Sequence, residues 1–253
     1  ASWFADPVLL RDAATMRELY ERSLTLPRNT GSNAEVAIVF SAEQMYNTDA
    51  YSPANSVHSA LVNYLYMRMF RLGAPFDLYL QTDLPELVAK GWHRQYRLVV
   101  FMNSFCLSPA ERELIRQDLL AEGRTALFFF APGYQGNADT TSELAVAGIE
   151  AVTGMTGVGR LDEKHLLGAD IEGKPFDVLP WWGAHQITNY GQEIGPTFYL
   201  DPGRSNGWTL WAGLRLDGER QAGKVAVAMR ESAGARVIYS VLPDLPQDLL
   251  DRV

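Results

Sequence analysis

The stretch Tyr96-Arg97-Leu98-Val99-Val100-Phe101-Met102-Asn103 decides the fold class of this chain of 253 residues. Its apolar run predicts a strand over 96–102, because a strand that is covered on both faces shows little alternation of apolar and polar residues. A helix start follows at Ser108-Pro109-Ala110-Glu111, and the helix is predicted to run to Gly123. A buried strand followed by a helix is the unit from which parallel α/β sheets are built.

The same unit recurs on both sides of this stretch. Strands are predicted over 36–40, 76–80 and 126–130, and a helix with an apolar face is predicted over 56–72. We therefore expect an α/β fold with a flavodoxin-like, doubly wound, mainly parallel sheet and helices on both faces. In such a sheet ligands bind beyond the carboxyl ends of the strands. The candidate residues there are Ser41, Glu43, Gln44, Asn103, Ser104 and Tyr134.

The second half of the chain is rich in predicted strands. Runs over 209–216, 224–229 and 235–241 are separated by Asp-Gly and Ala-Gly turns, which are typical of hairpins. We interpret them as antiparallel strands added to the sheet or laid beside it. The sequence over 154–195 is rich in glycine and of mixed polarity, and no structure is predicted for it.

The first segment is predicted to be a separate helix. Asp6-Pro7 supplies a capping residue and a proline at the first helical position, and Pro27 ends the element. We expect 1–33 to be an N-terminal helix and linker from a preceding domain, and 34–253 to be the α/β domain with its β-rich C-terminal part. The chain has no initiator methionine and stops within an apparent helix, so we expect a fragment of a longer polypeptide.

Composition excludes several classes of function. The net charge of −8, with no run of Lys or Arg, argues against a nucleic-acid partner, because phosphate binding needs a basic surface. No apolar stretch reaches the ~20 residues that span a bilayer, so no membrane partner is expected. The single cysteine, Cys106, excludes an internal disulfide and a thiolate-rich metal site. The N-terminus does not read as a signal peptide, and we expect a cytoplasmic protein.

Several motifs together carry a family resemblance. They are the strand at 96–103, the segment Leu107-Ser108-Pro109-Ala110-Glu111-Arg112 and the segment Leu120-Ala121-Glu122-Gly123-Arg124-Thr125. With the first strand, Ala34 to Val39, they resemble the trimerisation domain of family 42 β-galactosidases, which has a class I glutamine-amidotransferase-like fold. Gly195-Pro196-Thr197-Phe198 and the closing strands at 224–227 and 237–246 are similar to those of related large bacterial glycosidase-like proteins.

The resemblance implies a domain that holds protomers together and lies beside a (β/α)₈ barrel. The catalytic carboxylates of the parent enzyme would be on that barrel, which this chain does not contain. The implied partners are therefore other copies of the same chain and an adjacent catalytic barrel domain. No cofactor is implied.

Cys106 is the first candidate nucleophile, because amidotransferases use a cysteine. That chemistry needs a thiolate on a sharp strand-to-helix turn with a histidine partner. Phe105 and Leu107 flank Cys106 in place of glycines, and the turn after the next strand reads Ala131-Pro132-Gly133. We predict a structural thiol and no catalytic residue.

The remaining polar candidates favour structural roles. His58, His93, His165 and His185 show no ligand spacing, so no metal site is predicted. Glu43 could lie at the rim, but no second carboxylate is paired with it as glycosidase chemistry requires. Gly154-Met155-Thr156-Gly157-Val158-Gly159 resembles a dinucleotide fingerprint only superficially, since no ordinary strand precedes it and no clear helix follows.

Tryptophans are the most suggestive feature of the second half. Trp181 and Trp182 lie in a Gly-rich loop, and tryptophan rings stack on sugars and anchor interfaces. Packing over the sheet is the alternative role for this pair. Trp208 and Trp211 should face opposite sides of a strand, with one of them in the core.

Three hypotheses follow. The first is a non-catalytic accessory and oligomerisation domain of a larger glycoside hydrolase-like, β-galactosidase-like protein. The second is a carbohydrate-binding module that uses the Trp181-Trp182 loop. The third is a Cys-dependent amidase or amidotransferase relative, for which the missing nucleophile is the main objection.

Overall fold

The structure is a computed structural model, and it describes residues 6–25, 31–47, 56–135, 142–178, 193–232 and 234–253. Contacts within the chain divide it into two compact units, unit 1 (Ala1–Asn33) and unit 2 (Ala34–Val253). The assignment of 1–33 to a preceding domain stays a prediction.

Unit 1 contains the helix α1 (Pro7–Ser23), whose first amides are capped by a side chain. The Asp6 carboxylate accepts hydrogen bonds from the Val8 amide at 2.7 Å and the Leu9 amide at 3.4 Å. No residue of α1 is buried. Its apolar side chains therefore gain nothing from burial within the unit, and most helical stability in proteins comes from such burial.

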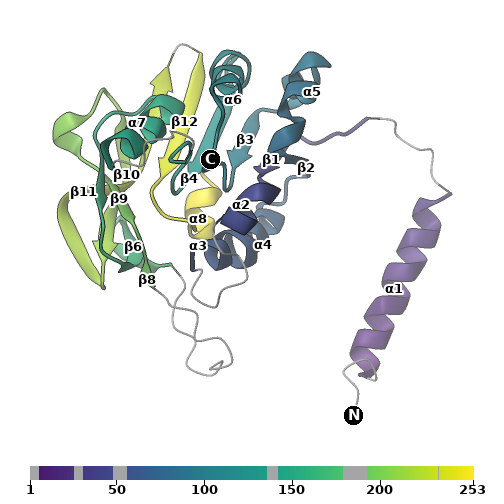
Figure 1. The fold of residues 1–253 in the computed structure, drawn as a ribbon. Coiled ribbons are helices and arrows are strands. Elements are labelled where there is room, and N and C mark those ends of the chain that lie inside the picture. Colours follow the sequence, from purple (N-terminus) through teal and green to yellow (C-terminus); the bar gives the residue numbers. More distant parts are fainter. Residues whose placement is uncertain (1–5, 26–30, 48–55, 136–141, 179–192, 233) are drawn as a thin grey trace. The chain divides into compact units, whose positions relative to one another are not determined.

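Unit 2 begins with the predicted parallel strands. They are β1 (Val36–Phe40), β2 (Phe76–Leu80), β3 (Leu98–Phe101) and β4 (Thr125–Phe129). The strand order is β2-β1-β3-β4, and each neighbouring pair is parallel (Figure 1). Of these strands β1, β3 and β4 are buried almost throughout, which explains their continuous apolar sequences. The predicted mixed α/β fold with a parallel sheet is confirmed.

Helical segments connect these strands. The segment after β1 starts with α2 (Ala42–Asn47) and continues through α3 (Ser56–Ser59), a π-helical stretch, α4 (Tyr66–Met69) and a short 3₁₀ turn, Phe70–Leu72. Gly73 ends it in a left-handed conformation, as the sequence predicts. The other two connections contain α5 (Leu84–Ala89) and α6 (Pro109–Leu114).

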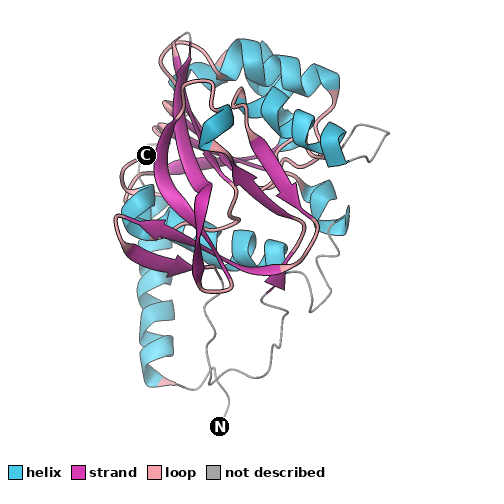
Figure 2. Cartoon of the chain, turned by 90° about the vertical axis from the view of Figure 1, so that its left-hand side faces the viewer, coloured by secondary structure: helices cyan, strands magenta, loops and turns pink. Residues whose placement is uncertain are grey.

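The β-rich half extends the same sheet (Figure 2). The strand β12 (Ala235–Ser240) follows β4, and next come β11 (Glu219–Ser232), β10 (Thr209–Leu216), β6 (His165–Ile171) and β7 (Lys174–Asp177). The prediction that all the added strands are antiparallel is wrong for β12, which pairs parallel with β4 and antiparallel with β11. The cause is that β12 is buried between two strands and shows no sequence signal for the direction of its neighbours.

The region between residues 142 and 200 contains elements that the sequence analysis did not predict. They are α7 (Ser142–Thr153), β5 (Val158–Leu161), β8 (Glu193–Ile194) and β9 (Thr197–Leu200), together with β6 and β7. The strands β5 and β9 pair with each other, β8 pairs with β6, and β9 also meets β11. These short antiparallel pieces complete a sheet of twelve strands in the described part of the chain.

A buried ion pair fastens the C-terminal segment to the helix that precedes β2. Asp244 follows β12 and is fully buried, and its carboxylate accepts hydrogen bonds from the Arg68 guanidinium of α4 at 3.0 to 3.4 Å. Burial raises the pKa of Asp244 to about 6, and the contact with Arg68 acts in the opposite direction. The guanidinium also lies over the Phe176 ring. The short helix α8 (Gln247–Leu250) follows and packs two leucines into the core.

Candidate functional site

The predicted rim lies where β1 and β3 end at the same edge of the sheet. Asn103 joins the two strand ends: its Oδ1 accepts a hydrogen bond from the Ser41 amide at 2.7 Å, and its Nδ2 donates to the Ser41 carbonyl at 2.9 Å. Both residues are buried, with 2% of Asn103 and 5% of Ser41 exposed. The Asn103 amide therefore bonds the backbone at this edge and is not presented to solvent.

Replacing Asn103 by alanine should lower the free energy of unfolding by about 1–3 kcal/mol, because it leaves the buried Ser41 amide and carbonyl unpaired. Urea denaturation measures the loss. Ser104→Ala is the matched control, because the Ser104 hydroxyl is buried and has no hydrogen-bond partner within the described residues. An Asn103→Ala variant as stable as Ser104→Ala would contradict this role.

Two residues that the sequence analysis did not single out surround Cys106. Gln81 donates from Nε2 to the Cys106 carbonyl at 2.8 Å and to the Glu111 carboxylate at 2.9 Å. Glu111 also accepts from the Ser108 amide at 2.7 Å, as the second half of a capping box. The Ser-x-x-Glu spacing was the signal for this contact, whereas nothing in the sequence links Gln81 to it.

The thiol of Cys106 is half-buried and lies in an acidic environment. Burial raises its pKa, Glu111 and Glu43 raise it further, and Arg112 opposes them. A nucleophilic cysteine needs the reverse arrangement, with positive charge or a helix N-terminus to lower the pKa. Cys106 is therefore protonated at neutral pH, and its structural role stays a prediction.

Iodoacetamide should alkylate Cys106 more slowly at neutral pH than it alkylates a free cysteine, because only the thiolate reacts and the pKa of Cys106 is raised. The alkylation rate should continue to rise with pH beyond about pH 8.5, which is the ordinary pKa of a thiol. Mass spectrometry of the modified chain over a pH series measures it. A rate that has already levelled off at pH 7 would contradict the raised pKa.

The turn after β4 holds a strained residue. Phe130 has a φ of 58°, a left-handed conformation that bulky side chains rarely adopt. Its amide donates to the Ser240 carbonyl at 2.7 Å, and its carbonyl accepts from the buried Tyr239 hydroxyl at 2.7 Å. In hydrolases with a nucleophile elbow, a strained strand-to-helix turn of this kind carries the nucleophile. Here the position carries an aromatic side chain.

Aromatic rings fill the space around this turn. Phe130 is 6% exposed and makes edge-to-face contacts with Phe105 at 5.8 Å and Phe198 at 5.3 Å between ring centroids. Tyr134 also contacts Phe198, with 5.3 Å between ring centroids, and the Arg160 guanidinium lies 5.7 Å from the Tyr134 ring centroid. We call Phe105, Phe130, Tyr134 and Phe198 the aromatic cluster. It leaves no reactive group at the strained position.

The other predicted residues lie in α2, near the start of β10 (Thr209–Leu216), or outside the described residues. Glu43 is exposed and Gln44 is buried beside it at the start of α2. Trp181 and Trp182 lie outside the described residues, so the carbohydrate-binding hypothesis that rests on them stays a prediction. Trp208 is buried and donates from Nε1 to the Thr156 carbonyl at 2.9 Å, while Trp211 is half-buried.

The glycine-rich stretch that resembled a dinucleotide fingerprint is a closed turn between α7 and β5. The Glu150 carboxylate accepts hydrogen bonds from the Gly157 amide at 2.8 Å and the Val158 amide at 3.1 Å. These are amides that a phosphate group would need. The Glu150 carboxylate occupies both of them, so these two amides are not presented to a phosphate group.

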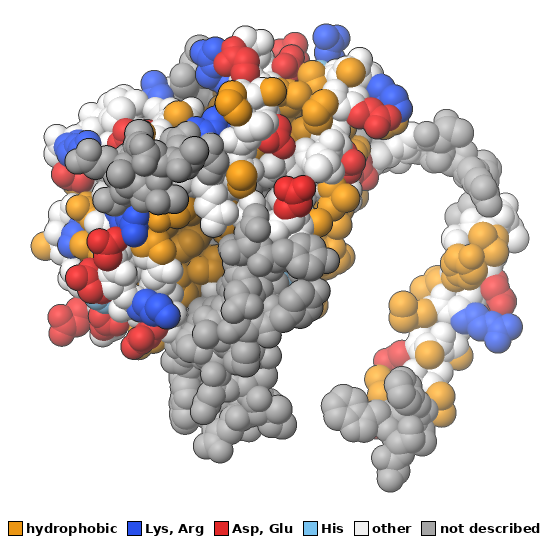
Figure 3. Space-filling view, in the orientation of Figure 1, with side chains coloured by type: hydrophobic (Ala, Val, Ile, Leu, Met, Phe, Trp, Pro, Cys, Tyr) orange, Lys and Arg blue, Asp and Glu red, His pale blue; other side chains and the backbone are white. Residues whose placement is uncertain are grey.

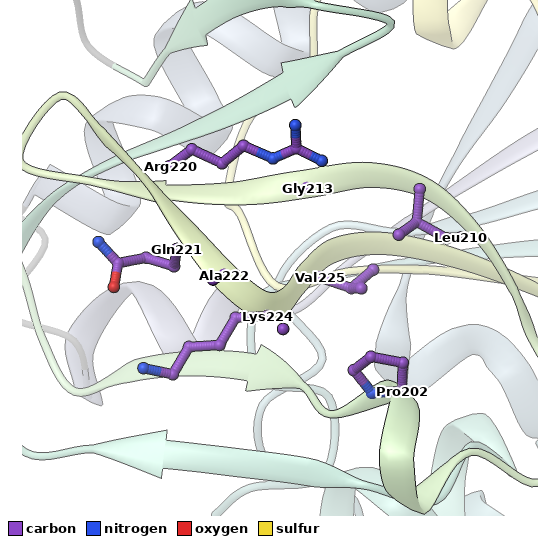
Figure 4. A pocket seen from close by; sticks show the side chains of 9 residues that line it. Pro202, Leu210, Gly213, Arg220, Gln221, Ala222, Lys224 and Val225 are labelled. Carbon is purple, nitrogen blue, oxygen red and sulfur yellow. The ribbon is translucent and has the colours of Figure 1, made fainter.

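A groove opens on the β-rich half, and none of the described residues that line it is a predicted site residue. It has a volume of about 410 Å³ and is lined by Pro202, Leu210, Val225 and the irregular part of β11 that contains Arg220 and Lys224 (Figure 4). The ammonium group of Lys224 lies over the ring of Tyr199, 5.1 Å from its centroid. Among the described residues that line the groove there is no aromatic ring on which a sugar could stack.

Within the described residues no group of three or more His, Cys, Asp or Glu side chains could hold a metal ion. Nor does any helix in the described ranges have the length and apolar character needed to cross a membrane.

Comparison with known proteins shows the fold and no more. No protein-family model matches the sequence, and a search of curated proteins also found no match. Among solved structures, the chain is similar to a β-galactosidase from the Antarctic haloarchaeon Halorubrum lacusprofundi, with 17% identity, a TM-score of 0.59 and 94% of this chain covered. Gan42B, a GH42 β-galactosidase, matches over 98% of this chain with 12% identity and a TM-score of 0.57.

A β-galactosidase from Bacillus circulans sp. alkalophilus is similar over 96% of this chain, with 12% identity and a TM-score of 0.53. The chain spans only about a third of the length of these proteins, namely 32%, 32% and 33%. Their fold therefore includes a part that corresponds to nearly all of this chain.

Proposed function

We propose that unit 2 is a non-catalytic accessory and oligomerisation domain of a larger, glycoside hydrolase-like protein. Its flavodoxin-like, amidotransferase-like sheet holds copies of the protein together and lies beside a catalytic barrel, as in a trimerisation domain of family 42 β-galactosidases. The conformation and burial of Phe130 are the main support for a non-catalytic domain. The strained turn that would present a nucleophile carries a buried aromatic ring instead.

Three further observations support the proposal. The strand order β2-β1-β3-β4-β12 supports a flavodoxin-like sheet, in which function would be decided by the residues at the carboxyl edge. At that edge Asn103 and Glu111 are used in internal hydrogen bonds, and Cys106 has a raised pKa. The solved structures that share the fold are named β-galactosidases, and the chain corresponds to a third of their length.

Activity assays test the catalytic half. Purified chain should hydrolyse neither nitrophenyl β-galactoside nor glutamine above the rate of a buffer blank, and Cys106→Ala should behave like the wild type. Hydrolysis of glutamine that disappears in Cys106→Ala would contradict the proposal and would favour the amidase hypothesis.

A titration tests carbohydrate binding as the second candidate. Galactosides and oligosaccharides should leave the tryptophan fluorescence of the chain unchanged if unit 2 serves only support and assembly. A saturable change that is lost in a Trp181→Ala/Trp182→Ala variant would instead favour the binding module, since stacking on a sugar alters the surroundings of the ring.

A further inference from the structure

An irregularity in the pairing of β10 with β11 forms one wall of the groove on the β-rich half. Between two successive pairs of the register, β10 advances by two residues, from 213 to 215, while β11 advances by five, from 220 to 225. The additional residues of β11, 221–224, form a bulge in which Gly223 has a left-handed φ of 70°. We call residues 221–224 the β11 bulge. Bulges are frequent beside active sites, where they redirect side chains and interrupt the regular pairing.

Apolar side chains line part of the groove beside the β11 bulge. Leu210 and Val225 come from the paired strands, and Pro202 begins the 3₁₀ turn that follows β9 (Figure 4). Leu210 is 55% exposed, so most of its apolar surface is open to solvent. The volume of about 410 Å³ lies within the range of ligand pockets, which is ~300–1,000 Å³. The groove therefore has room for a small molecule with an apolar body.

Arg220 supplies a positive charge to this groove. Its side chain extends from β11 towards Gly213 of β10 (Figure 4). A Cβ atom at position 213 would lie 3.5 Å from Nε and 3.8 Å from Nη2 of Arg220, so the guanidinium lies directly over this glycine. Arg220 is exposed, and it belongs to none of the ion pairs formed within the described residues.

The residue opposite Arg220 is also basic. Arg215 of β10 pairs directly with Arg220 in the register of the two strands. Like charges in such a cross-strand pair are destabilising, and a bound anion would relieve their repulsion. The Arg215 guanidinium donates to the Gly218 carbonyl of the hairpin turn, which is a neutral acceptor and leaves its charge in place. The pair of arginines therefore favours an anion at this end of the groove.

Neighbouring charges do not neutralise Arg220 through direct contact. Lys224 is a second basic residue that lines the groove, and it too is absent from the ion pairs of the described residues. Asp170 of β6 lies opposite Gly213, but its carboxylate accepts a hydrogen bond from the Gly173 amide at 2.9 Å. The chain as a whole carries a net charge of −8, and acidic and basic side chains are interspersed on the face drawn in Figure 3. Two basic residues without an ion-pair partner at one groove are a local departure from that distribution.

We propose that the groove binds a small organic anion, with its carboxylate or phosphate group against the Arg220 guanidinium and its apolar body against Leu210 and Val225. A guanidinium can donate to two oxygens of such a group at once, which fixes the orientation of the ligand. The apolar lining favours an anion that carries a hydrocarbon or aromatic body over an inorganic ion. The inference does not depend on the proposed assembly function.

Fluorine NMR of two probes with the whole chain provides the test. The probes are para-fluorobenzoate, which carries a carboxylate, and para-fluorophenyl phosphate, which carries a phosphate on the same ring. At least one of them should show a saturable change in line width, and the tighter of the two identifies the anionic group that the groove prefers. The uncharged para-fluorobenzyl alcohol should bind at least ~10-fold more weakly than that probe, because it cannot form a charge-assisted hydrogen bond with Arg220.

Substitutions assign the binding to the groove. Arg220→Met should raise the dissociation constant of the tighter probe at least ~10-fold, and Leu210→Ala should raise it ~3-fold through lost apolar contact. Arg71→Met is the matched control, because it removes the same charge from an exposed arginine that does not line the groove, and it should bind like the wild type. All three positions are exposed, so each variant should stay folded by circular dichroism.

Three results would each contradict the inference. The first is the absence of saturable binding of either anionic probe to the wild type. The second is equal binding by Arg220→Met and Arg71→Met, which would place the probe elsewhere on the chain. The third is an uncharged alcohol that binds as tightly as the anions, because the guanidinium would then have no part in recognition.

Discussion

Replacing Arg68 by methionine should lower the free energy of unfolding by about 3–5 kcal/mol at neutral pH, because it leaves a buried carboxylate without its partner. Asp244 is fully buried and hydrogen-bonded to Arg68 through both carboxylate oxygens. Methionine fills much of the volume of the arginine stem, so the loss reports the charge more than the packing. Urea denaturation followed by circular dichroism measures it.

The loss should depend on pH in a defined direction. Burial already raises the pKa of Asp244 to about 6, and removing Arg68 takes away an influence that lowers it. In Arg68→Met the folded state therefore holds a proton that the unfolded state releases near its ordinary pKa of about 3.9. The free energy of unfolding of the variant should fall as pH rises from about 4 through the raised pKa of Asp244. Its loss relative to the wild type is therefore smallest in acid and complete at a pH above that raised pKa.

Two further variants isolate the ion pair. Arg68→Met/Asp244→Leu should recover most of the stability, because replacing a buried pair by apolar residues is often neutral or better. Arg71→Met is the control, since Arg71 is an exposed arginine within the same helical segment. If Arg68→Met loses no more than Arg71→Met, or loses the same amount at pH 5 and pH 8, the buried carboxylate does not set the stability.

Replacing Phe130 by alanine should lower the free energy of unfolding by about 3–5 kcal/mol, as for other buried phenylalanines. Its ring packs between Phe105 and Phe198, and alanine would leave a cavity in the aromatic cluster. The strained backbone offers no compensation, because alanine is also disfavoured at a φ of 58°. Thermal and urea unfolding of the variant measure the change.

Tyr134→Phe is the matched control within the aromatic cluster. It keeps the ring that contacts Phe198 and removes only a hydroxyl, so its stability should stay within about 0.5 kcal/mol of the wild type. A Phe130→Ala chain as stable as this control would show that the turn after β4 does not serve the core.

The parallel half of the fold could be predicted from the sequence because each strand there is a short apolar run followed by a helix start. Val36–Phe40 and Phe76–Leu80 have the predicted bounds, and Gly73 ends its helix as expected. The β-rich half was harder to predict from the sequence. The strand β12 is buried between a parallel and an antiparallel neighbour, and a strand's own residues do not encode the direction of its partners.

The candidate site was only partly predictable, for a similar reason. Asn103 follows a strand that the sequence reveals, so its place at the carboxyl edge could be inferred, although its bond to the Ser41 backbone could not. The contact of Gln81 with Cys106 joins residues 25 positions apart, and only the order of the strands brings them together. The strain at Phe130 is likewise invisible in sequence, because the left-handed conformation is more often occupied by glycine or asparagine.

The molar mass of the wild-type chain in solution tests the assembly function most directly. Multi-angle light scattering on the chain over increasing concentration should give a mass that rises above the mass of one chain. A mass of one chain at every concentration, in a sample that is folded by circular dichroism, would contradict the account.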